Sequence, residues 1–454
     1  MKFIFYLAIL FSVLFVFSCK KEISEEPKIS NPKITIETSK TYQEMTGFGG
    51  ALTWYSDRII SSPKSNEICQ LLFDDLGMDI LRLKNWYYPT DYPNNKSPQT
   101  MVTTGDKTMF DATNQFYTKA KTSNPNIKIL LSSWGPPASL KSNNNLNEGT
   151  LKKNANDQFM YDEFAQYWID ILDNISFTPD YISIQNEPSY INAGWTTCMW
   201  SSTETSLYPG YNTAFQKVHD RIASRANSPE MIGPESANNT AFENFAPALK
   251  NLDYCKAYAY HTYSFNQSTD YNTIKNTLQN IPYSFDNKPC FMTEYSGMSW
   301  LKTARLIQYN LIYANASAYV YWDMVWGDAN TKDNAMIYID YSGNYTVNSF
   351  YYLVKHFSKF IDRGYQRINV TTKYSNVDIS GFINPAKTQI TLIVVNDEAG
   401  QINFDFEIDN YNILGIKGFQ SVEGNYFKDM GSLTPDSGVA LPAHSISTLV
   451  LDIN

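Results

Sequence analysis

The chain has 454 residues, which is enough for one large domain with a smaller partner and for a sizeable buried core. It has 36 Lys and Arg against 45 Asp and Glu, a formal net charge of −9, and no basic block, so we do not expect nucleic acid as a partner. Four His and no HExxH pattern give no support for a catalytic metal, and we expect no other cofactor.

The N-terminus predicts export. An apolar run from Phe3 to Phe17 ends in Ser18-Cys19 and is followed by two lysines, which is the layout of a signal peptide and is too short for a membrane span. A Cys after a small residue resembles a lipobox, so we expect residues 1–19 to be a lipoprotein signal peptide with Cys19 lipidated. An ordinary signal peptide is the alternative. Residues 20–32 are charged and aperiodic, and predict a tether to a bacterial membrane.

The remaining cysteines do not form a recognisable pattern. An exported protein can form disulfides, but these four residues are widely and irregularly spaced, with no CxxC and no metal-type cluster. We expect buried free thiols, with pairing between the last two left open: Cys69, Cys198, Cys255 and Cys290.

Short β-rich runs alternate with longer amphipathic stretches about eight times over residues 45–360. One such stretch, Gln158–Asn174, has apolar side chains at helical spacing. Eight βα units predict a closed (β/α)8 barrel, an α/β TIM-barrel fold with its active site at the carboxyl ends of the strands. An open doubly wound sheet is the rival, but Gly47–Gly50 lies inside a strand and not in a phosphate-binding turn. The expected strands are Thr46–Thr53, Asp79–Asn85, Lys128–Trp134, Tyr181–Glu187, Met231–Glu235, Ala257–Tyr263, Pro289–Glu294 and Ala318–Trp322.

The pattern changes after Phe360. Alternating short runs such as TQITLIVVND and ISTLVLDI, separated by turn residues, predict a C-terminal antiparallel β-sandwich over residues 361–454. The early segment 33–44 begins with the same alternation (KITIET). We therefore expect it to form a strand that joins this side domain from the other end of the sequence.

Two glutamates end predicted strands. Glu187 closes the fourth strand in the sequence YISIQNEP, with Asn186 beside it, and Glu294 closes the seventh in CFMTEYS. A barrel brings such strand ends across one pocket, and retaining glycoside hydrolysis needs two carboxylates about 5 Å apart. A single Glu at a strand end is more often a structural hydrogen-bonding group. The pair on strands four and seven predicts a nucleophile and a general acid/base.

These motifs resemble glycoside hydrolase family 30, in the clan whose acid/base and nucleophile follow strands four and seven. The resemblance runs from about Met45 to the C-terminus and is closest to the bacterial xylanase branch. It rests on an ordered set of segments: TGFGGALTW, ILRLKNW, SSWGPPASLK, SIQNEPSY, IGPES, HTY, FMTEYS, NSFYYLVKHFSKFIDRGYQRI and LPAHSISTLVL.

The resemblance implies a role for each matching residue. Glu187 is the acid/base and Glu294 the nucleophile, Asn186 binds the 2-hydroxyl of the sugar, and Arg82 braces the nucleophile, although a purely structural ion pair is the alternative for Arg82. Trp134 and Trp322 form hydrophobic walls, and Tyr190 and Trp195 stack on the leaving side. His261 and Tyr263 contact substrate or nucleophile, although a hydrogen-bonded core residue is the alternative for His261. Glu235 is a hydrogen-bond organiser, and Trp54 lines the site or packs in its loop.

The resemblance also implies a substrate. We expect an endo-β-1,4-xylanase acting on a polysaccharide or oligosaccharide, as a monomer by default. The loop after strand eight contains Asp323 and Asp328 and no Arg, so we do not expect dependence on a glucuronate branch. β-1,6-Glucanase, β-1,6-galactanase and glucosylceramidase-like activities remain alternatives. A non-catalytic glycan-binding lipoprotein and a structural or adhesive lipoprotein are the alternatives of a different class.

Overall fold

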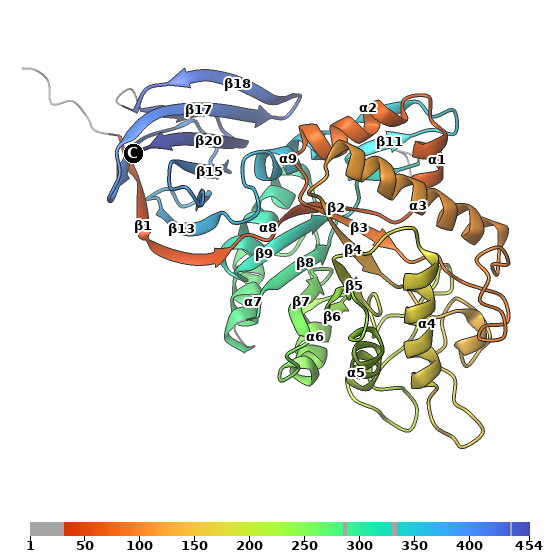
Figure 1. The fold of residues 1–454 in the computed structure, drawn as a ribbon. Helices are drawn as coiled ribbons and strands as arrows, with labels where there is room; N and C mark the ends of the chain where they lie inside the picture. The colour runs from red at the N-terminus through yellow and green to blue at the C-terminus, as the bar shows by residue number, and fades with distance from the viewer. Residues whose placement is uncertain (1–30, 285–287, 328–333, 436–437) are drawn as a thin grey trace, which may run out of the picture.

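The computed structural model describes residues 31–284, 288–327, 334–435 and 438–454. Figure 1 shows two lobes, a barrel ringed by helices and a smaller β-sheet lobe. The predicted signal peptide, Cys19 and nearly all of the tether lie outside the described residues and stay predictions. Within the described part of the chain, no helix is long and apolar enough to cross a membrane.

Eight parallel strands close into the barrel, which confirms the predicted fold. The first strand pairs with both the second and the last, so the sheet has no free edge and the open-sheet alternative is wrong. The strands are β2 (Gly47–Leu52), β3 (Ile80–Lys84), β4 (Lys128–Ser132), β5 (Tyr181–Ser183), β6 (Glu230–Ser236), β7 (Cys255–His261), β8 (Cys290–Glu294) and β9 (Ala316–Tyr321).

Several strands end earlier than the sequence predicts. β5 stops at Ser183, although the apolar run continues to Ile184, and Glu187 has a left-handed backbone with φ of 49°. The chain is held in this turn by backbone bonds: the amide of Asn186 donates to Ser133 at 2.6 Å and that of Glu187 to Glu235 at 2.9 Å. The polar residues after the strand therefore belong to a fixed turn at the barrel mouth.

Helices surround the barrel. They are α1 (Ser56–Ser61), α2 (Ser65–Gln70), α3 (Thr104–Ser123), α4 (Tyr161–Asn174), α5 (Tyr211–Ile222), α6 (Asn239–Phe245), α7 (Tyr271–Ser284), α8 (Trp300–Ile312) and α9 (Ser349–Ser358), with a π-helical turn at Leu71–Asp75 and 3-10 turns at Ala138–Leu140 and Ala246–Leu249.

α4 begins three residues later than predicted. Its apolar face is buried as expected, with Phe164, Trp168 and Ile171 each 0% exposed. The residues before it instead bridge to the preceding loop, where Phe159 pairs with Lys153, and this competes with helical hydrogen bonding.

The side lobe is one continuous nine-stranded sheet around its own apolar core. Its order is β18 (Asn425–Leu433), β17 (Ile413–Val422), β20 (Ser445–Ile453), β15 (Gln389–Asn396), β14 (Val377–Ile383), β13 (Gln366–Thr371), β1 (Lys33–Glu44), β16 (Ile402–Ile408) and β19 (Val439–Leu441). The early strand β1 pairs antiparallel with β13 and parallel with β16, so one pair departs from the predicted antiparallel arrangement. Its side chains Ile34 and Ile36 are fully buried in the core of this lobe.

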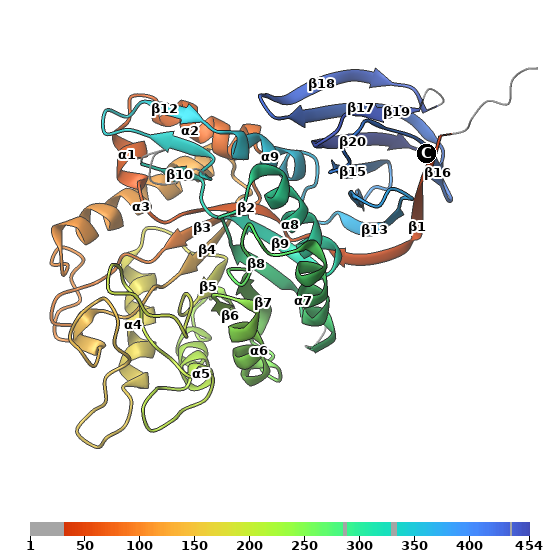
Figure 2. The same cartoon turned by 180° about the vertical axis from the view of Figure 1, so that it is seen from behind.

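The two lobes are joined through α8 and α9, which contact the side sheet (Figures 1 and 2). Arg305 on α8 bonds Asp378 and Asp397 at 2.6 Å each. His356 on α9 is 0% exposed and bonds hydroxyls of Thr448 and Ser421 at 2.9 and 2.7 Å. These buried polar contacts hold the sheet against the barrel.

A small three-stranded sheet forms in the connection after β9. Its strands are β10 (Val325–Trp326), β11 (Ile337–Ile339) and β12 (Tyr345–Val347). Figure 2 shows it beside α1 and α2. It places Trp326 next to the carboxyl end of β9, where the barrel opens.

Candidate active site

A cavity of about 770 Å³ opens at the carboxyl ends of the barrel strands. This is the face where barrel enzymes place their chemistry. Its lining is largely aromatic, with few polar groups, which is the usual character of a site for a small ring-shaped ligand. The lining residues are Trp54, Tyr55, Trp134, Asn186, Glu187, Tyr190, Gly194, Trp195, Ala237, Asn238, Tyr263, Glu294, Trp322 and Trp326.

The two predicted catalytic glutamates meet in this cavity. Glu187 follows β5 and Glu294 ends β8, and their side chains are 13% and 8% exposed. One carboxylate oxygen of each, together with a ring nitrogen of His261, lies within 4.8 Å of the others. The two carboxyl groups are therefore close enough to act on one bond.

Arg82 is the centre of a buried polar network beneath them. From the inside of β3, its guanidinium donates to Glu294 Oε2 at 2.6 Å, to Glu235 Oε1 at 2.8 Å and to Asn186 Oδ1 at 2.6 Å. Burial opposes the charge, but Glu235 and Glu294 outweigh it and raise the pKa of Arg82. The structure thus gives Arg82 the carboxylate partner that a buried arginine requires.

The environment of Glu187 favours its protonated form. Burial raises the pKa of Glu187 to about 7, while Arg82 opposes and Glu235 reinforces the shift. Its Oε1 lies 3.0 Å from Nδ1 of His261. Burial lowers the pKa of His261 to about 4, so this imidazole is neutral at neutral pH and bonds a carboxyl group that holds a proton.

Glu294 lies in a different environment. It accepts from Arg82 on one oxygen and from the Tyr263 hydroxyl at 3.0 Å on the other. Burial, with the charges of Glu294 and Glu187, raises the pKa of Tyr263 well above its usual value, so the phenol remains a donor. Each oxygen of the Glu294 carboxylate therefore accepts one hydrogen bond.

Glu235 organises the network. Its backbone is also left-handed, with φ of 55°, and its side chain is 0% exposed. Oε1 accepts from Arg82 and, at 3.0 Å, from the hydroxyl of Ser132. Burial opposes ionisation, but Arg82 and His261 lower the pKa of Glu235 overall, so it remains an anion beneath the site.

Four tryptophans form one wall of the cavity. Trp54 lies at their centre, with edge-on contacts to Trp322 at 5.5 Å, Trp134 at 6.1 Å and Trp326 at 6.3 Å between ring centroids. Trp134 and Trp322 also lie over the Arg82 guanidinium at 4.8 and 6.0 Å. Trp54 is therefore part of the cavity wall as well as of the loop packing.

A second aromatic group of the lining lies in the loop after β5. Tyr190 and Trp195 are 39% and 42% exposed, and their rings are stacked with centroids 6.4 Å apart. They share a loop with Glu187, so they lie on the side where a general acid would meet the leaving group. Exposed stacked rings suit the apolar faces of sugars.

The sequence prediction missed some of the lining. Tyr55 and Asn238 reach the cavity from loops and Trp326 from the short strand β10, and only the position of Trp326 four residues after Trp322 could have suggested it. Lys84, which lies behind the lining against the rings of Trp54 and Trp134, was also missed. It follows Arg82 by two residues on the same strand face, a spacing that points both side chains inward.

Glu187, His261 and Glu294 also have the donor types of a metal site. However, Glu294 is already bonded to the Arg82 cation, and a metal ion would lie next to that positive charge. The donor set fits a proton-transfer site better than a cation site.

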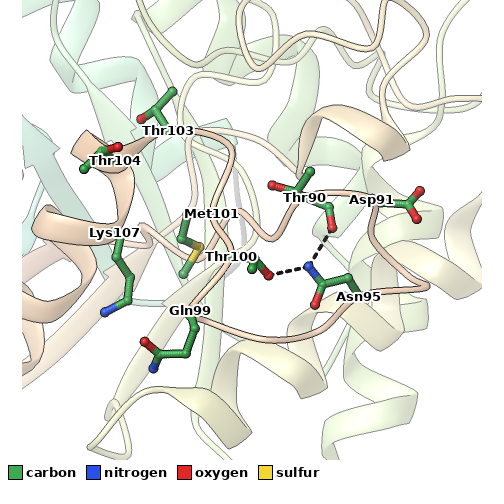
Figure 3. A pocket seen from close by; sticks show the side chains of 9 residues that line it. All are labelled: Thr90, Asp91, Asn95, Gln99, Thr100, Met101, Thr103, Thr104 and Lys107. Carbon is green, nitrogen blue, oxygen red and sulfur yellow. Dashed lines mark hydrogen bonds between the residues drawn. The ribbon is translucent and has the colours of Figure 1, made fainter.

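A separate hollow of about 500 Å³ lies in the loop between β3 and α3. Figure 3 shows its polar lining, where Asn95 donates from Nδ2 to the carbonyl of Thr90 at 3.0 Å and to the Thr100 hydroxyl. Its lining contains no aromatic ring and no pair of carboxylates, so we do not assign it chemistry.

The four cysteines of the described chain, Cys69, Cys198, Cys255 and Cys290, are buried and free, which confirms the expectation of unpaired thiols.

Comparison with known proteins gives the site its context. No protein-family profile matches the chain. The glucuronoxylanase XynC of Bacillus subtilis is 24% identical over 359 residues, which are 74% of this chain and 78% of that protein. An endo-1,6-β-D-glucanase of Aspergillus fumigatus is 26% identical over 338 residues, 67% of this chain and 64% of that protein.

Solved structures agree with these relatives on the fold. The catalytic domain of the family 30 xylanase C of Talaromyces cellulolyticus is 20% identical and superposes with a TM-score of 0.73, covering 92% of this chain and 99% of that one. The chain is therefore similar in sequence to glycoside hydrolases, which include both xylanases and endo-1,6-glucanases, and it shares the fold of a family 30 xylanase.

Proposed function

We propose that this protein is a retaining hydrolase of glycoside hydrolase family 30, with Glu187 as acid/base and Glu294 as nucleophile. The observation that carries the proposal is the approach of the two carboxyl groups, which have oxygens within 4.8 Å of each other. Retaining enzymes place these groups about 5 to 5.5 Å apart, whereas inverting enzymes leave room for a water molecule at about 6.5 to 9.5 Å.

The first step forms a glycosyl-enzyme. The Glu294 carboxylate attacks the anomeric carbon while the Glu187 proton passes to the departing glycosidic oxygen. Arg82 bonds Asn186 through Oδ1, which turns the amide NH₂ toward the cavity. That NH₂ donates to the 2-hydroxyl of the sugar, a contact that strengthens as positive charge develops at the anomeric carbon.

The second step releases the sugar. Glu187, now ionised, takes a proton from water, and the water oxygen attacks the anomeric carbon to free Glu294. The ionised form is stabilised by the neighbouring His261, which can donate from Nδ1 in one tautomer. Two displacements at one carbon leave the anomeric configuration unchanged.

The proposed substrate is β-1,4-xylan without a required glucuronate branch. The segment that begins at the last residue of β5, SIQNEPSY followed by Trp195, is the feature that favours xylan. Asp323, 2% exposed at the end of β9, adds negative charge near Tyr55 and Tyr263 of the cavity. Negative charge there disfavours a uronate as the required recognition group, while Asp328 lies outside the described residues.

A second candidate substrate is β-1,6-glucan. It is favoured by the matches to endo-1,6-β-glucanases, including the Aspergillus fumigatus protein and a Trichoderma harzianum enzyme that is 24% identical over 478 residues, 94% of this chain and 88% of that protein. The mechanism proposed above is the same for either linkage, because the reacting groups contact only the anomeric carbon and the leaving oxygen.

Product analysis on linear xylan, glucuronoxylan and β-1,6-glucan tests the proposal. We expect xylo-oligosaccharides from both xylans, and a loss of roughly 10²- to 10⁴-fold in the Glu187→Gln variant. Glu230→Gln, which changes an exposed carboxylate at the other end of β6, is the matched control and should retain full activity. Products from β-1,6-glucan alone would replace xylan as the substrate, and unchanged turnover in Glu187→Gln would contradict the mechanism.

A further inference from the structure

Lys84 is a buried cation that the proposed mechanism does not use. It ends β3, two residues after Arg82, so both side chains leave the same face of the strand and point into the barrel. Its exposed fraction is only 2%. Inward-facing residues at the carboxyl ends of barrel strands form the active site in this fold, so the position itself belongs to the catalytic face.

The Lys84 ammonium lies within a cage of aromatic rings. Its Nζ is 3.7 Å from the ring centroid of Trp86, 5.1 Å from that of Trp54, 5.6 Å from that of Trp134 and 5.9 Å from that of Tyr88. Trp54 and Trp134 also line the active-site cavity. The ammonium is therefore within reach of an oxygen on a sugar that packs against both of these rings.

This cation has no acceptor in the part of the chain that the structure describes. Among the described residues, no carboxylate oxygen lies within 4.0 Å of Nζ, and Nζ donates no hydrogen bond to them. The nearby charge is Asp106, whose Oδ2 accepts from the backbone and hydroxyl of Thr103 at the start of α3. Burial lowers the pKa of Lys84 to about 7, which shows that the site disfavours the charge.

Other buried lysines of the chain show what a structural role requires. Lys141 is 0% exposed and donates to the backbone carbonyls of Leu146 and Thr197. Lys302 is 8% exposed and donates to the carbonyls of Gln267 and Thr269. Lys84 differs because its Nζ lies over aromatic rings, two of which line the cavity, and has no oxygen acceptor among the described residues.

We propose that Lys84 is a substrate-binding residue, whose ammonium donates a hydrogen bond to an oxygen of the sugar held against Trp54 and Trp134. The inference rests on the proposed function, because the acceptor is the glycan substrate. The acceptor oxygen belongs either to a sugar hydroxyl or to the carboxylate of an acidic substituent. The aromatic cage holds the ammonium in place, and the substrate supplies the acceptor that the protein lacks.

The test is Lys84→Met, which keeps the length and packing of the side chain and removes the charge and the donors. It is compared with Lys64→Met, an exposed lysine over the Tyr345 ring away from the cavity. Both variants and the wild type are assayed for kcat/KM on linear xylan and on glucuronoxylan, or on whichever glycan the wild type cleaves. The Tm of each protein is measured in parallel.

We expect kcat/KM of Lys84→Met to fall at least about tenfold, with a Tm equal to or above that of the wild type, because a buried charge without an acceptor is removed. Equal losses on both xylans identify a hydroxyl as the acceptor, and a loss confined to glucuronoxylan identifies a carboxylate. Unchanged kcat/KM would overturn the inference. A fall in Tm together with activity would also overturn it, by showing that the cage is structural. Wild-type inactivity on every glycan would instead reject the proposed function.

Discussion

At the scale of single residues, the site separates two glutamates by their surroundings. Glu294 receives hydrogen bonds from Arg82 and Tyr263. Glu187 receives neither, and burial raises its pKa to about 7. Two residues of the same type therefore have different surroundings, which suit one to attack and the other to donate a proton.

The raised pKa of Glu187 predicts how the free energy of unfolding changes with pH. Because the folded protein holds this proton up to about pH 7 while an unfolded glutamate releases it near pH 4.5, stability is lost as the pH rises between these values. Glu187→Gln removes this loss, so we expect the variant to be more stable than the wild type above pH 7, by up to about 3 kcal/mol.

The difference should vanish at pH 4, where the wild-type carboxyl is protonated in both states. Urea unfolding at pH 4 and pH 8 measures it, with Glu230→Gln as a control that shows no such pH dependence. A variant equal to the wild type at pH 8 would mean that Glu187 is not held in a site that disfavours its charge.

At the scale of secondary-structure elements, fixed turns after the barrel strands position the side chains of the site. Glu187 and Glu235 both have positive φ, and a backbone hydrogen bond joins the amide of the first to the carbonyl of the second. The alternation of apolar residues predicts where a strand runs, but it does not show this turn. That is why the sequence placed Glu187 on the strand, whereas β5 ends four residues earlier.

The early strand β1 was predictable for a simple reason. The segment KITIET alternates apolar and polar residues, as a half-buried strand does, and it lies before the first barrel strand in the chain. The parallel pairing with β16 was not predictable, because alternation is the same for both directions of pairing.

We predict that β1 contributes to the core of the side lobe. Ile36 is 0% exposed and belongs to that core, so Ile36→Ala should lower the free energy of unfolding by roughly 2 to 4 kcal/mol. Thr35→Ala, at the neighbouring half-buried position, is the control and should change it little. Denaturant unfolding measures both variants. A loss below about 0.5 kcal/mol for Ile36→Ala would show that β1 is dispensable for the lobe.

At the scale of the whole molecule, a closed barrel brings residues from distant parts of the sequence to one mouth. The order of the motifs was sufficient to predict the barrel and to pair Glu187 with Glu294. The carboxyl ends of barrel strands lie on one face of the barrel whatever the conformation of the loops. The cavity wall was only partly predictable. Trp54 and Trp326 reach it through loop conformations and through the small β10–β12 sheet, which no periodicity in the sequence shows.

Double displacement by Glu294 with Glu187 as acid/base determines the anomeric form of the first product. Proton NMR during hydrolysis of a β-linked oligosaccharide that the enzyme cleaves records this form before mutarotation mixes the anomers. The proposed mechanism predicts that the β-anomer appears first and that Glu294→Gln yields no product. Initial formation of the α-anomer would show a single displacement by water and would contradict the mechanism.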